Sequence, residues 1–135
     1  MMRQLICLVV LPVLALAPLA HADERVVFRV MFGTSSAELD AAAVKVVEAA
    51  APRVKACEHN GVRVVGHTDT ALSNAESDEL GKARGRVVRD ALVARGVAGS
   101  AISAVGHGEN ELLVATRDGV SEPRNNRAEI ILVCD

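Results

Sequence analysis

Strand-like and helix-like segments alternate along this chain, and that alternation constrains the fold more than any other feature. Four runs are rich in β-branched or other apolar residues: 26–32, 62–67, 101–106 and 128–133. Between them, apolar residues recur at three- and four-residue steps from 40 to about 56 and from about 78 to 95, which predicts two helices. The resulting order, strand–helix–strand–helix–strand–loop–strand, predicts a single α+β domain.

The connections limit how these elements pack. Right-handed crossovers can join the first three strands and leave both helices on one face of the sheet. The last strand follows a long loop rather than a helix, so it can run antiparallel beside the others. We therefore expect a two-layer sandwich with a mixed sheet.

Gly81 and Gly85 weaken the second helix by roughly 1 kcal/mol each relative to Ala. A helix that keeps two glycines often has another element packed closely against it.

The first 22 residues are interpreted as a signal peptide. Arg3 precedes an apolar run without charges, and small residues end that run at Ala20 and Ala22. An uncleaved membrane anchor is the alternative, but the run is short and is interrupted by Pro12 and Pro18. We expect an exported domain of residues 23–135 with no integral membrane segment after cleavage.

Composition excludes some binding functions. The chain has 15 Lys and Arg against 17 Asp and Glu, a net charge of −2, which argues against binding a nucleic-acid backbone. Phe28 and Phe32 are its only aromatic residues, so the core must be aliphatic and no ring platform for bases or sugars is expected. Recognition would have to be polar and charge-based.

Two cysteines, Cys57 and Cys134, lie in the expected exported part. An even pair in an exported chain suggests a disulfide, and two unpaired buried thiols are the alternative. Cys57 lies just before the second strand and Cys134 ends the fourth. An antiparallel pairing of those two strands would bring the cysteines together. Closing so long a loop would stabilise the fold by roughly 4 kcal/mol at most.

The stretch VVGHTDT at 64–70 places polar side chains at the end of a buried strand. A metal site, an acid/base site and a pocket for a charged ligand all fit that position. Zinc would need His67, Asp69 and a third ligand such as His107 or Glu109, but the spacing matches none of the usual zinc motifs. The sequence contains no nucleophile elbow, which argues against an acid/base catalytic site. We therefore expect no catalytic residue, no metal and no cofactor.

Four motifs occur in a specific order: FRVMFGTSSAELDAAA, VVGHTD, LGKARGRVV and VGHGENELLVATRDGVSEPRNNRAEI. Together they resemble the C-terminal, peptidoglycan-associating domain of the outer-membrane protein A (OmpA-like) family, from about Val26 to Val133. The resemblance implies a βαβαββ fold. It also implies a periplasmic protein at the cell wall or outer membrane, which binds the peptide stem of peptidoglycan at its diaminopimelate residue.

The resemblance implies six ligand-binding residues: Thr68, Asp69, Thr70, Arg84, Asn125 and Arg127. Asp69 corresponds to the family aspartate that holds an ammonium of diaminopimelate, and Arg84 corresponds to the arginine that holds a carboxylate. An arginine suits that role because its planar fork can bond a carboxylate through two donors. Without the family, the simpler interpretation of this pair is a surface ion pair worth roughly 0–1 kcal/mol.

The chain departs from the family pattern at Ser77, where Asn is common, at Gly81, where Ser is usual, and at Asn126, where the closing motif has Arg. These changes bear on affinity rather than on the identity of the ligand. Two alternatives remain open: a metal-assisted cell-wall hydrolase using His67, Asp69 and His107, and a structural envelope domain with a degenerate pocket that binds a protein partner.

Overall fold

The computed structural model describes residues 17, 24–58 and 61–134. The expected signal peptide therefore lies almost entirely outside the described residues. Among the residues that are described, no helix is both long enough and apolar enough to cross a membrane.

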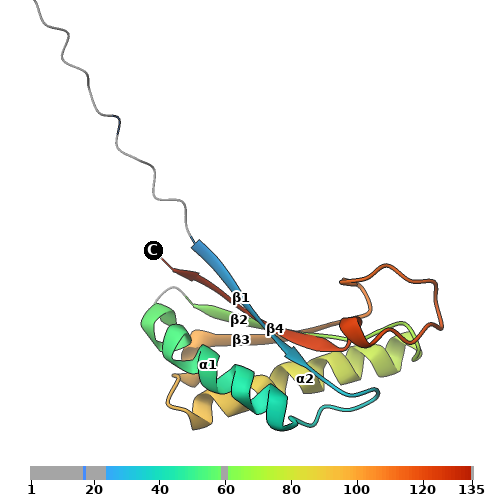
Figure 1. The fold of residues 1–135 in the computed structure, drawn as a ribbon, viewed down its shortest axis with the longest axis horizontal. Coiled ribbons are helices and arrows are strands. Elements are labelled where there is room, and N and C mark those ends of the chain that lie inside the picture. Colours follow the sequence, from blue (N-terminus) through green and yellow to red (C-terminus); the bar gives the residue numbers. More distant parts are fainter. Residues whose placement is uncertain (1–16, 18–23, 59–60, 135) are drawn as a thin grey trace, which may run out of the picture.

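A four-stranded sheet is covered on one face by two helices (Figure 1). The elements, in chain order, are β1 (Glu24–Met31), α1 (Ala41–Cys57), β2 (Val62–His67), α2 (Asn74–Ala94), β3 (Ile102–Gly108) and β4 (Arg127–Cys134), with short 3₁₀ turns at Gly99–Ala101 and Pro123–Asn125. The strand order is β1-β4-β2-β3, with β4 antiparallel to both β1 and β2, and β2 parallel to β3. The expected βαβαββ sandwich with a mixed sheet is confirmed.

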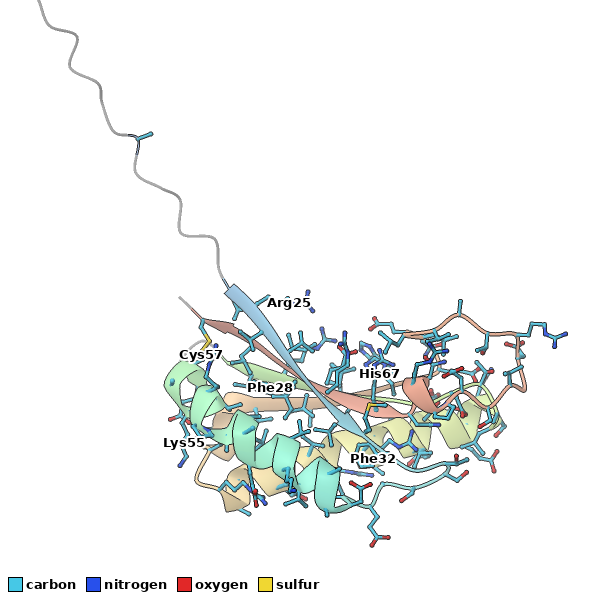
Figure 2. All side chains as sticks on the ribbon, viewed as in Figure 1. Arg25, Phe28, Phe32, Lys55, Cys57 and His67 are labelled. Atoms are coloured by element: carbon cyan, nitrogen blue, oxygen red, sulfur yellow. A yellow bond between two sulfur atoms is a disulfide. The ribbon has the colours of Figure 1, made fainter. Side chains whose placement is uncertain are left out.

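The core between sheet and helices is aliphatic, as the composition predicts. Val30, Val64 and Ile130 point from three strands toward the helices and are fully buried, as is Val47 of α1. Alternate residues of the same strands point to the other face, which no helix in the described part of the chain covers (Figure 2). That uncovered side is called the open face below.

Side-chain caps fix where both helices begin. The Asp40 side chain accepts a hydrogen bond from the Ala43 N–H at 2.8 Å and caps the first helix. The second helix begins at Asn74 rather than near Asp78, because Ser73 and Glu76 form a reciprocal capping box that satisfies the first turn. The expected start of this helix at about residue 78 is therefore wrong.

The two glycines of α2 allow that helix to lie unusually close to the sheet. A Cβ on Gly81 would lie 2.8 Å from the backbone N of Gly108, and one on Gly85 would lie 2.8 Å from the carbonyl oxygen of Val105. Glycine at these positions therefore brings the α2 backbone against the ends of β2 and β3. Arg84 lies between the two glycines on the same buried face of the helix.

The predicted disulfide between Cys57 and Cys134 is present, with the two Cα atoms 5.4 Å apart. It joins the end of α1 to the end of β4 (Figure 2). The antiparallel pairing of β2 with β4 brings the two ends together, as the sequence argument required.

Candidate functional site

Arg84 is a fully buried cation at the end of the sheet that carries the HTDT sequence. Its guanidinium donates four hydrogen bonds of 2.8–2.9 Å: to the carbonyl oxygens of Gly33, Ser36 and His67 and to Oδ1 of Asn126. It also lies 5.2 Å from the centre of the Phe32 ring. Burial lowers the pKa of Arg84 to about 10, while the nearby charge of Asp69 opposes that shift. Arg84 therefore remains charged at neutral pH.

Asp69 is the matching anion and is 2% exposed. Its carboxylate accepts four hydrogen bonds: from the N–H groups of Ala71 and Glu122, the hydroxyl of Ser121 and the side-chain amide of Asn126. Burial alone would raise the pKa of Asp69, but these hydrogen bonds hold that pKa below its usual value. Asp69 is therefore a buried carboxylate that is ionised at neutral pH.

Asn126 links the two charges. Its Oδ1 accepts from Nη1 of Arg84 at 2.9 Å and from the backbone N–H of Asp69 at 3.3 Å. Its Nδ2 donates to Oδ2 of Asp69 at 2.9 Å. A single amide thus bonds to the cation through its oxygen and to the anion through its nitrogen. The sequence marked Asn126 only as a departure from a family motif, and nothing in the local pattern showed this bridging position.

Thr70 and Asn125 hold the long loop between β3 and β4. The Thr70 hydroxyl donates to the carbonyl of Arg117 at 2.7 Å and accepts from the N–H of Val120. Oδ1 of Asn125 accepts the N–H groups of two consecutive loop residues, at 2.8 and 2.9 Å. Thr68 donates its hydroxyl proton to the carbonyl of Asp69. The side chains of Thr70 and Asn125 therefore hold the backbone of this loop, and Thr68 holds the backbone at Asp69.

Arg127 lies on the open face of the sheet, away from Arg84. Ala128 beside it points into the core, so the alternation of β4 turns Arg127 outward, where it bonds Glu129 at 2.7 Å. Of the six residues that the resemblance implied, the structure brings Asp69 and Arg84 together through Asn126. Thr68 lies directly beside them, and Thr70 and Asn125 lie in the surrounding loop contacts.

A second polar cluster lies on the open face at the same end of the sheet. The rings of His67 and His107 meet edge to face, with centroids 5.8 Å apart. Nδ1 of His107 lies 3.0 Å from a carboxylate oxygen of Glu111. His67 and His107 are thus neighbours, as a metal site would require, but their acidic neighbour is Glu111 rather than Asp69 or Glu109.

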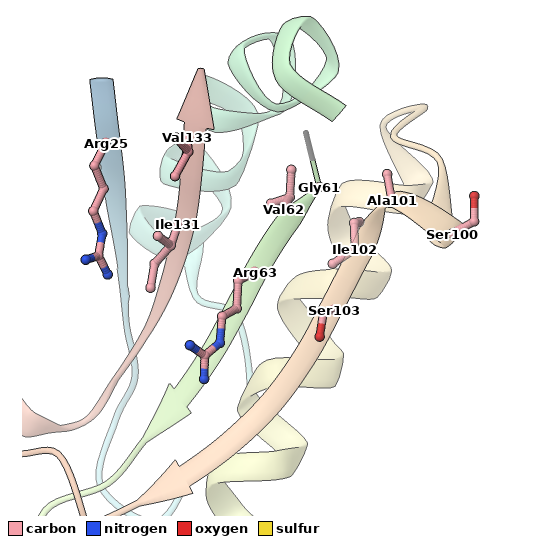
Figure 3. Close-up of a pocket in the computed structure, with 10 residues that line it drawn as sticks. All are labelled: Arg25, Gly61, Val62, Arg63, Ser100, Ala101, Ile102, Ser103, Ile131 and Val133. Atoms are coloured by element: carbon pink, nitrogen blue, oxygen red, sulfur yellow. The ribbon is translucent and has the colours of Figure 1, made fainter. Parts of the chain in front are cut away.

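Two grooves are present elsewhere on the described part of the chain. One, of about 490 Å³, lies on the open face at the far end of the strands (Figure 3), and its lining includes Arg25, Arg63 and Ile131. The other, of about 420 Å³, lies along the edge formed by β3 and α2, beside Lys82 and Arg86. Neither of these two grooves is lined by Asp69 or Arg84. Both residues are almost fully buried and are hydrogen-bonded within the chain, so the candidate site is a filled polar cluster.

Comparison with known proteins identifies relatives of this chain. A peptidoglycan-binding protein, ArfA, of Mycobacterium tuberculosis is 33% identical over 103 residues, which are 76% of this chain and 32% of that protein. An outer membrane protein of Gluconacetobacter diazotrophicus is 32% identical over 111 residues, covering 78% of this chain and 29% of the relative. The chain thus spans about a third of the length of the curated relatives it matches.

Solved structures share the fold. The OmpA-like domain of FopA1 from Francisella tularensis superposes with a TM-score of 0.71 at 23% identity, covering 82% of this chain and 73% of that one. The peptidoglycan-associated lipoprotein from Burkholderia pseudomallei gives a TM-score of 0.67 at 25% identity, covering 76% and 87%. The family signature itself matches residues 31–126, from the end of β1 to Asn126. The chain belongs to the OmpA family.

Proposed function

We propose that this chain is a non-catalytic, peptidoglycan-binding module that recognises the diaminopimelate of the peptide stem through Asp69 and Arg84. The observation that carries the proposal is the buried Asp69–Asn126–Arg84 unit at the end of β2, within a chain of the OmpA family. A relative that is 33% identical is named a peptidoglycan-binding protein, which supports the peptidoglycan part of the proposal.

The chemistry of diaminopimelate suits such a pair. The end of its side chain carries an ammonium and a carboxylate on one carbon, so a receptor needs an anion and a cation held a short distance apart. The Asn126 amide fixes that spacing because it bonds Asp69 and Arg84 at once. Both charges are already desolvated, which strengthens their interaction with an incoming ligand.

Binding requires the ligand to replace contacts within the chain. Nε and Nη2 of Arg84 form the edge that would grip a carboxylate through two donors, and they hold the carbonyls of Ser36 and Gly33. On the other side, Ser121 and Glu122 donate to the carboxylate of Asp69. The replaced groups belong to the turn after β1 and to the loop before β4. We propose that these two segments shift to admit the ligand.

Sedimentation with purified insoluble sacculi tests the proposal. Wild-type protein should sediment, and free diaminopimelate should release it. The Asp69→Asn variant should remain in solution, because it loses the anion while keeping the shape of the side chain. Asp118→Asn is the matched control, since Asp118 is exposed on the loop between β3 and β4. Circular dichroism of each variant establishes that it is folded.

The outcomes separate the alternatives. Sedimentation that survives both Asp69→Asn and excess diaminopimelate would contradict recognition by this pair and would favour a structural envelope domain. Release of soluble muropeptides by the protein would contradict a non-catalytic role. The proposal also places the chain in the periplasm, so the protein should be recovered from a periplasmic extract with its N-terminus at Asp23.

A further inference from the structure

His67, His107 and Glu111 form a compact group of metal-ligating side chains on the open face. One ligand atom from each lies within 4.8 Å of the others. His67 ends β2, His107 lies near the end of the parallel strand β3, and Glu111 follows in the next loop. Because β2 and β3 are parallel neighbours, their carboxyl ends lie together, and the two imidazoles lie at the same end of the sheet.

This group is separate from the Asp69–Arg84 site. A Cβ on Gly66 or on Gly106 would run into the backbone of α2, so these glycines face the helices. The next residues along the strands, His67 and His107, therefore project from the opposite face. Arg84 reaches the helix side of the same strand end, where it bonds the His67 carbonyl oxygen.

His67 is buried without a partner for one of its polar atoms. The residue is 2% exposed, and its Nδ1 has no hydrogen-bond partner among the residues that the structure describes. Buried side-chain nitrogens normally have a partner, so this nitrogen is expected to bind a water molecule or an ion. The ring of His107, the second member of the group, is perpendicular to the ring of His67, with their centroids 5.8 Å apart.

His107 is held by neighbours on both sides. Nη2 of Arg63 lies 3.1 Å from Nε2 of His107, and an arginine can only donate, so Nε2 accepts. With Nε2 as the acceptor, the ring proton is on Nδ1, which lies 3.0 Å from Oε2 of Glu111 but outside hydrogen-bond geometry. The side chain of Glu111 is 64% exposed, so this carboxylate is free to rotate toward the two rings.

We propose that His67, His107 and Glu111 bind a divalent transition metal ion, with zinc as the best match. Two imidazoles and one carboxylate form a common protein ligand set for zinc, which completes four-coordination with water. Ligand atoms about 2.0–2.2 Å from a tetrahedral zinc lie roughly 3–3.5 Å apart, so the group needs only a small contraction. Glu111 is already 3.0 Å from Nδ1 of His107, so the remaining approach is between His67 and these two groups.

The hydrogen bond from Arg63 makes a specific prediction. A metal bound at Nδ1 of His107 requires the ring proton to move to Nε2, and Arg63 cannot accept a hydrogen bond from that N–H. In the Arg63→Gln variant, a neutral amide oxygen replaces the guanidinium and can accept the Nε2–H. The same change removes a positive charge next to the ion. Arg63→Gln should therefore bind metal several-fold more tightly than wild type.

The test is a titration of tag-free, chelator-stripped, oxidised protein with Co²⁺, followed by visible absorption, and with Zn²⁺, followed by calorimetry. Wild type should bind one equivalent and show the intense Co²⁺ bands of a four-coordinate site. His67→Gln, His107→Gln and Glu111→Gln should each weaken binding at least tenfold. Glu109→Gln is the matched control and should bind as wild type does.

Several results would overturn the assignment. The first is that wild type shows no saturable metal binding. The second is that Glu109→Gln and Glu111→Gln lose metal affinity equally. The third is that His67→Gln keeps the metal affinity of wild type. Glu111→Gln alters an exposed side chain, so it tests the site even if a histidine variant fails to fold. An Arg63→Gln variant that binds less tightly would exclude Nδ1 of His107 as the ligand atom. Because sacculus binding is measured without metal, neither proposal depends on the other.

Discussion

Replacing Asn126 with alanine should destabilise the domain strongly, because it disconnects two buried charges. The variant loses the bond from Nη1 of Arg84, the bond to Oδ2 of Asp69 and a weaker bond from the Asp69 N–H. Hydrogen bonds to charged groups contribute about 1.5–3 kcal/mol each, and the unpaired partners stay buried. Two such bonds predict a loss of about 3–6 kcal/mol, a large share of the total stability of a small domain.

Urea unfolding at pH 7 measures this loss. The chain contains no Trp and no Tyr, so far-ultraviolet circular dichroism is the suitable probe. Asn126→Ala should lower the transition midpoint without a change in slope, since the surface exposed on unfolding is the same. Asn110→Ala, at an exposed asparagine of the loop that follows β3, should change stability by less than about 0.5 kcal/mol. A loss below about 1 kcal/mol for Asn126→Ala would refute the bridging role.

Three further outcomes are expected. Reducing the Cys57–Cys134 disulfide should lower the free energy of unfolding by about 2–4 kcal/mol, and an unchanged urea midpoint in dithiothreitol would contradict its structural role. Gly81→Ala should destabilise the fold despite the better helix propensity of alanine, because its methyl group would lie 2.8 Å from the backbone N of Gly108; a stabilised variant would show that α2 can move away. The pKa of Asp69 is lower in the folded state than in the unfolded state, so its contribution is complete above the unfolded value, about 3.9, and is lost as pH falls through the folded value. Wild type should therefore exceed Asp69→Asn in stability at pH 7, and the difference should shrink below about pH 4; a constant difference would contradict this linkage.

Much of the fold followed from the sequence because its signals are local. The alternation of strand-like and helical patterns predicted the element order, and the positions of Cys57 and Cys134 predicted the disulfide once β2 and β4 were paired. The start of α2 was wrong by four residues, although the signal was present. The pair Ser73 and Glu76 is a capping box, and the structure shows both of its hydrogen bonds.

The site was harder to predict because its geometry depends on contacts far apart in the chain. Asp69 and Asn126 are 57 residues apart, and no periodic pattern links them. The resemblance grouped Arg127 with Asp69, whereas the two-residue alternation of β4 places its side chain on the open face. Glu111 lies in an irregular loop, so its approach to His107 could not be read from a strand or helix pattern.

The central claim is that this domain recognises diaminopimelate through one anion and one cation. Calorimetric titration with two soluble stem peptides, identical except for diaminopimelate or lysine at the third position, tests it most directly. Lysine keeps the side-chain ammonium and lacks the carboxylate that Arg84 would bind. The account predicts that the diaminopimelate peptide binds at least tenfold more tightly. Equal affinities would show that Arg84 does not read a carboxylate and would contradict the proposed recognition.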